Sequence, residues 1–238
     1  MKAVLPDYRV RRSLKSKSLR LKVTREEGLC VVLPHGFDET RVPAILRQKR
    51  AWIADALKRV AETRRFLEPK PVTHLPDTVR LAALGETWAV IYRDDKAGSG
   101  LRLRTEDGKL VISGASLARE GVIRKLKGWL RVRVREGLFP MAEILAARHH
   151  LGLAKLLVKS QRTRWASCSS RRNLSLNTKM LFLSPELVRY VLIHELCHTL
   201  HMEHGKEFWR LVAAYEPRYK VLDGMLRQAW KTVPQWMF

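Results

Sequence analysis

Apolar and polar residues alternate near the start of the chain, as they do along a β-strand with one buried face. Leu19, Leu21 and Val23 alternate with basic or hydroxyl-bearing residues, and a second apolar run covers residues 29–33. Turn-forming residues separate the two runs. The pattern therefore predicts a β-hairpin within residues 8–34.

After the predicted hairpin, the apolar spacing changes to that of a helix. Asp38 is suited to cap the start of this helix, and Pro43 falls early enough in it to be tolerated. The helix should end before residues 68–71, which contain two prolines and are interpreted as a connector. Its predicted buried stripe consists of Val42, Ile45, Leu46, Trp52, Ile53, Leu57 and Val60.

Short apolar runs separated by turn sequences follow the connector. Gly85-Glu86 and Asp107-Gly108 are typical of turns between strands. From residue 116 to about residue 151 the spacing is helical, with a break expected near residues 137–140. The short strands are predicted at residues 81–84, 88–92, 101–103 and 110–112.

The C-terminal part mixes strands and helices in the same way. Strands are predicted at residues 156–158 and 173–177, ahead of a strongly apolar helix and two further helices. Strand and helix runs that are largely separate along the chain favour an α+β fold. We expect two domains: residues 1–114 as a β-rich module with one helix, and residues 115–238 as the domain that carries the candidate site.

The apolar helix carries the most specific chemical motif of the chain. Ser184 is a suitable N-cap, and Pro185 suits the first helical position. His194, Glu195 and His198 form an H-E-x-x-H pattern, in which positions i and i+4 share a helix face, so both imidazoles can reach one ion beside the glutamate. Apolar residues surround the rest of the axis, which is typical of a buried helix, and a bound cation removes the cost of burying these polar groups.

A third ligand is expected downstream, because catalytic zinc usually has three protein ligands and one water. On a continuous helix His201 would lie about 10 Å from the first motif histidine, which is too far for a shared ion. His204 is within reach if the helix stops near Met202 and the chain turns back, with Gly205 supplying backbone freedom. Glu216 is the alternative, since other zinc hydrolases use a downstream glutamate.

The charge of the chain is strongly positive. Lys and Arg number 46 against 23 Asp and Glu, which gives a formal net charge of +23. Such a field attracts polyanions, including nucleic acid, nucleotides and anionic membrane. The basic residues concentrate at residues 9–22, 119–135 and 162–172, and each cluster alone is typical of a solvated surface. Together they make non-specific nucleic-acid contact through a basic surface a candidate.

The cysteines and apolar runs indicate the compartment. Cys30, Cys168 and Cys197 cannot all pair, and two of them lie in or near the candidate site, so a reducing compartment is expected. No run is long enough to span a membrane, and the N-terminal run Ala3–Leu5 is too short for the core of a signal peptide. We expect a cytoplasmic protein with no membrane partner.

The sequences RTRWASCSS, NLSLN and LVRYVLIHELCHTLHMEHGKEFW, all within residues 161–209, resemble those of the YgjP-like metallopeptidase family, which is related to the SprT-like zinc proteases. The resemblance implies that residues 115–238 form a zincin-like catalytic domain with a central metal-binding helix and a small sheet. It implies a Zn2+ cofactor held by the two motif histidines and His204, with Glu195 as catalytic acid/base. Roles near the site are implied for Arg164, Trp165, Ser167 and Cys168.

Three functions are compatible with these observations. The first is a zinc-dependent hydrolase, most simply a metallopeptidase acting on a peptide or protein. The second is a metal-dependent nucleotide phosphohydrolase of the pyrophosphatase type. It is suggested by four residues just before the metal helix, Arg162, Arg164, Arg171 and Arg172. The third is a nucleic-acid-binding module with structural zinc, which requires four protein ligands and no open position.

Substrate contacts are expected from the segment before the metal helix. A strand beside the metal can present its edge to an extended peptide. The candidate substrate-binding residues are Arg164, Trp165, Ser167 and Asn177. The candidates for stabilising an oxyanion are Arg164, His201, Tyr190 and Tyr215.

Overall fold

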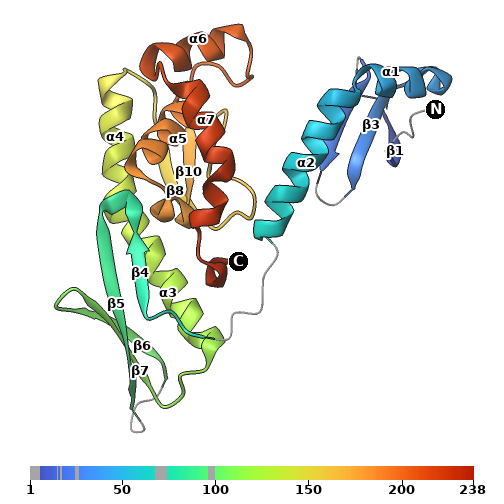
Figure 1. Ribbon diagram of the computed structural model, residues 1–238. Coiled ribbons are helices and arrows are strands. Elements are labelled where there is room, and N and C mark those ends of the chain that lie inside the picture. Colours follow the sequence, from blue (N-terminus) through green and yellow to red (C-terminus); the bar gives the residue numbers. More distant parts are fainter. Residues whose placement is uncertain (1–5, 15, 17, 25–26, 68–73, 96–99) are drawn as a thin grey trace. The chain divides into compact units, whose positions relative to one another are not determined.

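The computed structural model describes residues 6–14, 16, 18–24, 27–67, 74–95 and 100–238. The chain has a mixed α+β fold, as its sequence pattern predicts, and it divides into two compact units, Met1–Glu68 and Pro69–Phe238 (Figure 1). The connector predicted at residues 68–71 lies outside the described residues. The domain boundary predicted after residue 114 falls within the second unit and stays a prediction about domain organisation.

The first unit contains a sheet in which the strand that comes last in the sequence of that unit lies at the centre. β2 (Arg20–Thr24) and β3 (Gly28–Pro34) form the predicted antiparallel hairpin. Gly28 at the turn has a φ of 68°, a conformation that glycine adopts without strain. β1 (Tyr8–Ser13) runs parallel to the other side of β3, so the strand order is β1-β3-β2.

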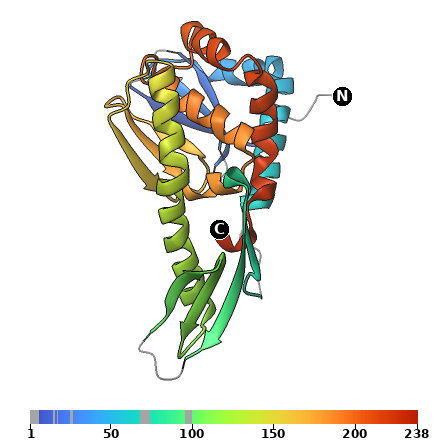
Figure 2. The ribbon, with the colours of Figure 1, turned by 90° about the vertical axis from the view of Figure 1, so that its left-hand side faces the viewer.

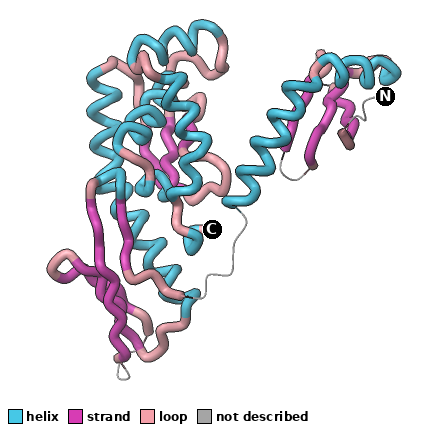
Figure 3. The backbone as a smooth tube through the Cα atoms, viewed as in Figure 1, coloured by secondary structure: helices cyan, strands magenta, loops and turns pink. Residues whose placement is uncertain are grey.

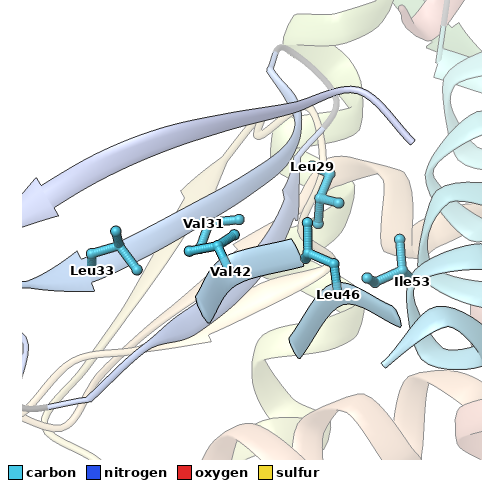
Figure 4. Packing of buried hydrophobic residues seen from close by; sticks show 6 residues of the cluster. All are labelled: Leu29, Val31, Leu33, Val42, Leu46 and Ile53. Carbon is cyan, nitrogen blue, oxygen red and sulfur yellow. The ribbon is translucent and has the colours of Figure 1, made fainter. Parts of the chain in front are cut away.

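One face of this sheet packs against two helices, α1 (Val42–Gln48) and α2 (Arg50–Leu67). Side chains from β3 meet side chains from the helices in a core of which no member is more than 1% exposed (Figure 4). Burying one such side chain contributes about 1.5–3 kcal/mol, so this cluster is the main source of stability for the small unit. Its members are Leu29, Val31, Leu33, Val42, Leu46 and Ile53.

The single helix predicted after Asp38 is wrong in one respect, because it is interrupted at Lys49. Asp38 accepts a hydrogen bond of 3.0 Å from the Thr40 N–H and thereby caps a short 3-10 turn, η1 (Glu39–Arg41), ahead of α1. Lys49 has a ψ of 13° and separates the two helices, although its N–H still donates to the Ile45 carbonyl and the Ile53 N–H donates to the Lys49 carbonyl. Ile53, seven residues after Leu46, lies on the same helix face and is buried, whereas Trp52 lies off that face and is 44% exposed.

The second unit begins with a four-stranded sheet in the order β4-β5-β7-β6. Both predicted turns are confirmed, since Gly85, Asp107 and Gly108 all have positive φ. The predicted strand at residues 81–84 is wrong beyond its first residue, because Ala82–Leu84 form a 3-10 turn, η2, that Gly85 terminates. The strands are β4 (Thr78–Leu81), β5 (Glu86–Asp94), β6 (Arg102–Glu106) and β7 (Lys109–Gly114).

A long helical rod follows this sheet (Figure 2). α3 (Arg119–Arg133) continues through a π-helical turn, η3 (Val134–Leu138), into α4 (Phe139–Arg148). The break predicted near residues 137–140 is therefore a widened turn, which keeps the chain helical past Pro140. Gly137 fits this turn closely, because a Cβ there would lie 2.5 Å from the Leu84 side chain.

The remaining elements surround the candidate site. β8 (Lys155–Lys159), β9 (Ala166–Cys168) and β10 (Asn173–Asn177) form a sheet in the order β8-β10-β9, with β8 parallel and β9 antiparallel to β10. Figure 3 shows these strands lying among the helices of the second unit. α5 (Pro185–Cys197) contacts β9, α4, α6 (Lys206–Tyr215) and α7 (Tyr219–Gln228).

Cys30, Cys168 and Cys197 are free thiols in the described structure. Among the described helices, none combines the length and the apolar content that a bilayer crossing requires.

Candidate metal centre

The helix that carries the motif is capped as its sequence predicts. Ser184 accepts a hydrogen bond of 3.4 Å from the Leu187 N–H, and Pro185 occupies the first turn. Apolar side chains are buried all round the axis, so α5 is a core helix. It ends at Cys197, earlier than the expected stop near Met202, and the chain turns back at once.

The turn after α5 brings a third histidine to the two motif histidines. One ligand nitrogen from each of His194, His198 and His204 lies within 4.8 Å of the others. The Nε2 atoms of His194 and His204 are 3.1 Å apart. Two imidazole nitrogens on one tetrahedral zinc ion, each about 2.0–2.1 Å from it, are separated by about 3.3 Å. The separation of the His194 and His204 nitrogens and the donor type therefore fit zinc.

The orientation of His198 is fixed by the chain itself. Its Nδ1 lies 2.9 Å from the carbonyl oxygen of His201. Because a carbonyl can only accept, Nδ1 carries the proton and Nε2 keeps its lone pair, the form in which imidazole binds metals. His201 thus acts through its backbone.

The protonation state of the cluster also favours metal binding. Burial, followed by the charges of His198 and His204, lowers the pKa of His194 to about 4. Burial also lowers the pKa of His198, and the His204 charge adds to this, while the hydrogen bond to His201 opposes it. Both rings are consequently neutral at physiological pH and able to donate a lone pair.

Gly205 does not use the conformational freedom of glycine at this turn. Its φ of −76° and ψ of −175° are extended values that any residue adopts, and it precedes the first residue of α6. The return of the chain to the site depends instead on the early end of α5.

Glu195 lies against β9, on the same turn of α5 as the first motif histidine. Burial raises the pKa of its carboxyl to about 7, against the opposing effects of a backbone hydrogen bond from Cys168 and the charge of Arg164. A carboxyl with this pKa can both accept and release a proton near neutral pH. Burial, then the charge of Glu195, in turn raises the pKa of the Cys168 thiol to about 11.

A cavity of about 480 Å³ adjoins the histidine cluster. The segment 163–168 forms one part of its lining, and α5, the turn that follows α5, and α7 contribute the rest. Arg164, Trp165 and Ser167, all predicted from the sequence, line this cavity together with the three histidines and Glu195.

Asn177, unlike the other predicted substrate-binding residues, is not among the residues that line the cavity. Its side chain is fully buried, and its Nδ2 donates to the carbonyls of Gln161 and Arg164, at 2.8 and 2.6 Å. Its Oδ1 accepts from the Lys179 N–H at 3.1 Å. These contacts occupy the amide on both sides, so Asn177 holds the segment 161–164 in place.

Of the four candidates for stabilising an oxyanion, two line the cavity. Arg164 is exposed at the cavity, and Tyr190 lies one helical turn before His194. The Tyr215 hydroxyl faces the carbonyl oxygen of His149 at 3.5 Å. Burial and then the charge of Asp223, which also lines the cavity, raise the pKa of the Tyr190 phenol.

Glu216, the alternative third ligand, lies outside the histidine cluster. It is 7% exposed, and its carboxylate forms an ion pair with Arg189. Arg189 also donates a hydrogen bond of 3.3 Å to the Tyr215 carbonyl. The burial of Glu216 is therefore explained by a contact between α5 and the end of α6.

Sequence reasoning did not identify two supports of the site. The backbone carbonyl of His201 leaves no side-chain signal in the sequence. Trp230, which stacks on Trp165, lies far from it along the chain, so no local pattern indicates the contact.

Comparisons with known proteins show the family of the chain. The model of the YgjP-like, metallopeptidase domain family matches residues 17–229. Among solved structures, the crystal structure of the metallopeptidase zymogen of Pyrococcus abyssi abylysin aligns with 23% identity and a TM-score of 0.35, over 37% of this chain and 90% of that chain. The comparison with curated proteins found no match.

Proposed function

Because the chain belongs to the YgjP-like metallopeptidase family, we propose that it is a zinc-dependent peptidase in which His194, His198 and His204 hold the ion. Glu195 is its catalytic acid/base. One observation carries the proposal: three imidazoles converge to within 4.8 Å, and the Glu195 carboxyl lines the same cavity.

Bound zinc would supply a Lewis acid that polarises a carbonyl and lowers the pKa of water. Glu195 then takes a proton from the attacking water and passes it to the leaving amine. Arg164 and Tyr190 are the cavity groups able to stabilise negative charge that develops on the substrate oxygen.

The substrate is a peptide or protein in an extended conformation. β9 lies at one edge of its sheet, contacts the metal helix, and pairs with β10 on its other side. The edge of β9 that is not paired with β10 can hydrogen-bond to the main chain of a peptide through groups other than the Cys168 N–H, which donates to Glu195, and can present a peptide bond to the site. Trp165 and Ser167 line the same cavity and contact the bound segment.

The substitution Glu195→Gln tests this proposal. It keeps the size of the side chain and removes the proton acceptor, so turnover of a peptide substrate should fall by about 10²–10⁴-fold. Zinc stoichiometry, measured by elemental analysis, should stay the same. Glu203→Gln makes the same chemical change at an exposed position outside the cavity and should leave turnover intact. Full activity of Glu195→Gln with normal zinc content would rule out the assignment.

The two alternatives have weaker support. Four arginines were considered for phosphate binding, and among the described residues that line the cavity Arg164 is the one that belongs to this group. The described histidine group has three members, which leaves a coordination position open and favours catalytic over structural zinc. Phosphate release from nucleoside triphosphates, measured beside peptide cleavage on the same zinc-loaded protein, separates a phosphohydrolase from a peptidase.

A further inference from the structure

The sheet of the first unit has a strongly basic outer face. Side chains alternate between the two faces of a strand, so the register of the β1-β3-β2 sheet determines which residues share a face. β1 and β2 both align with the central strand β3: Arg9 and Lys22 lie beside Cys30, and Arg11 and Arg20 lie beside Val32.

These four basic residues lie on the face opposite the core. On β3 the side chains at odd positions, Leu29, Val31 and Leu33, point instead to α1 and α2 (Figure 4). All four basic residues are exposed. The aliphatic stems of arginine and lysine can cover apolar surface beside them, which agrees with the 2% exposure of Cys30 at the centre of the face.

The spacing of these charges is set by the sheet. Residues two apart on a strand are about 6.7 Å apart, and the two edge strands are about 10 Å apart across β3. Four cations thus share a small area, where like charges repel one another unless an anion neutralises them. The described acidic partner on this side is Glu27, which pairs with Arg11 at 2.6 Å. Arg11 is 64% exposed in this pair, so the contact contributes little and can be exchanged.

We infer that this outer face binds the phosphodiester backbone of nucleic acid, without reading its sequence. Rows of arginine and lysine match a polyanion with closely spaced charges. Among the described strand residues of the face none is aromatic, so it offers no platform on which unpaired bases stack. Duplex DNA or RNA, which presents its phosphates outward, is the form that suits the face.

A matched pair of double variants of the full-length chain tests this inference. Arg9→Glu with Lys22→Glu reverses two charges on the outer face. Arg12→Glu with Arg47→Glu reverses two charges elsewhere in the same unit, because Arg12 lies in register with the core residue Leu33 and Arg47 lies on α1. Both variants lower the net charge equally. Binding of a short mixed-sequence DNA duplex is measured by fluorescence anisotropy over a range of salt concentrations.

The wild type should bind the duplex with an affinity that falls steeply with salt concentration. The slope of log binding constant against log salt concentration should be smaller by about 2 in the outer-face variant, because each phosphate contact contributes about 0.9 to that slope. The control variant should keep a slope close to that of the wild type. Thermal unfolding verifies that both variants fold. Equal loss in the two variants would show that net charge alone is responsible and would overturn the inference. Binding to phosphatidylserine-containing vesicles but not to duplex would overturn it in favour of a membrane surface.

Discussion

The ring of Trp165 stacks on the ring of Trp230, with centroids 3.9 Å apart and an angle of 18° between the planes. Trp165 lines the cavity beside the histidine cluster, whereas Trp230 belongs to the short helical turn η5 (Ala229–Thr232) that follows α7. One wall of the site is therefore supported by a residue near the C-terminal end of the described chain.

Replacing Trp230 should increase the mobility of Trp165 in the cavity lining without removing the metal. Trp230→Leu removes the stacked ring from a buried position and should destabilise the fold by about 2–3 kcal/mol. We expect KM for a peptide to rise and zinc stoichiometry to stay unchanged. Chemical denaturation, steady-state kinetics and elemental analysis measure these three quantities.

Trp88→Leu is the matched control, because Trp88 contacts Trp129 at the other sheet of the second unit and does not line the cavity. It should lower stability without raising KM. A KM that rises equally in both variants would mean that global loosening, rather than the Trp165 contact, affects substrate binding.

The third metal ligand can be identified by comparing two neighbouring histidines. His204→Ala removes one of the three converging nitrogens and should weaken zinc binding by more than 100-fold, whereas His201→Ala keeps the backbone carbonyl that orients His198. A ligand that binds only the folded state stabilises it by about 2.7 kcal/mol at a concentration 100 times its Kd. Zinc should thus raise the melting temperature of the wild type and of His201→Ala but not of His204→Ala. The reverse ranking would exclude His204 as a ligand.

Glu216 provides a separate test of the ligand set. Glu216→Gln breaks the ion pair with Arg189, and because Arg189 is partly exposed the cost should be about 1–2 kcal/mol. Zinc stoichiometry and affinity, measured by titration with a competing chelator, should not change. Loss of zinc from Glu216→Gln would show that the carboxylate, and not His204, completes the site.

Lys179 should make stability depend on pH in the alkaline range. It is 4% exposed, and its Nζ donates to the Gln161 carbonyl at 3.0 Å. Burial, then the charges of Lys127 and Arg162, lowers its pKa to about 8 from an ordinary value of 10.5. Between these values the unfolded state binds more protons than the folded state, so stability rises with pH and is lost again as pH falls towards 8.

The stability difference between the wild type and Lys179→Met, measured by chemical denaturation, should change in favour of the wild type by about 1–3 kcal/mol between pH 8 and pH 10. The raised pKa values of the Cys168 and Cys197 thiols act in the opposite direction over the same range, and those of Tyr92 and Tyr190 above it, but these groups are common to both proteins. Lys155→Met, at an exposed position on β8, should follow the pH dependence of the wild type. An unchanged slope in Lys179→Met would refute this origin of the pH dependence.

The sequence predicted those parts of the fold that depend on local periodicity. The hairpin of β2 and β3 and the course of α5 follow from alternating or helical spacing and from residues such as Ser184 that mark an element's start. The turns at Gly85 and Gly108 follow from the freedom of glycine at positive φ.

Features that depend on contacts between distant segments could not be predicted. The interruption at Lys49 lies inside a pattern that predicts a continuous helix. A break was predicted near residues 137–140, but its form, a π turn that keeps the chain helical, depends on packing. At the site, the motif indicated two histidines and Glu195, but spacing alone left His204 and Glu216 as alternatives for the third ligand. The choice among them depends on where α5 ends, which local spacing does not determine.

The topology shared by the sheets has a consequence for how the chain folds. Each sheet contains three consecutive strands of which the first and the last are parallel neighbours. The last of the three lies between the other two in space: β3 lies between β1 and β2, β7 between β5 and β6, and β10 between β8 and β9. Each arrangement closes within a short contiguous segment, so the entropy lost on closure is small. Before the central strand of a sheet has been synthesised, however, the two strands beside it lack the strand with which each of them pairs. Amide hydrogen exchange should consequently report three locally closing units, in which the central strands β3, β7 and β10 are the most protected.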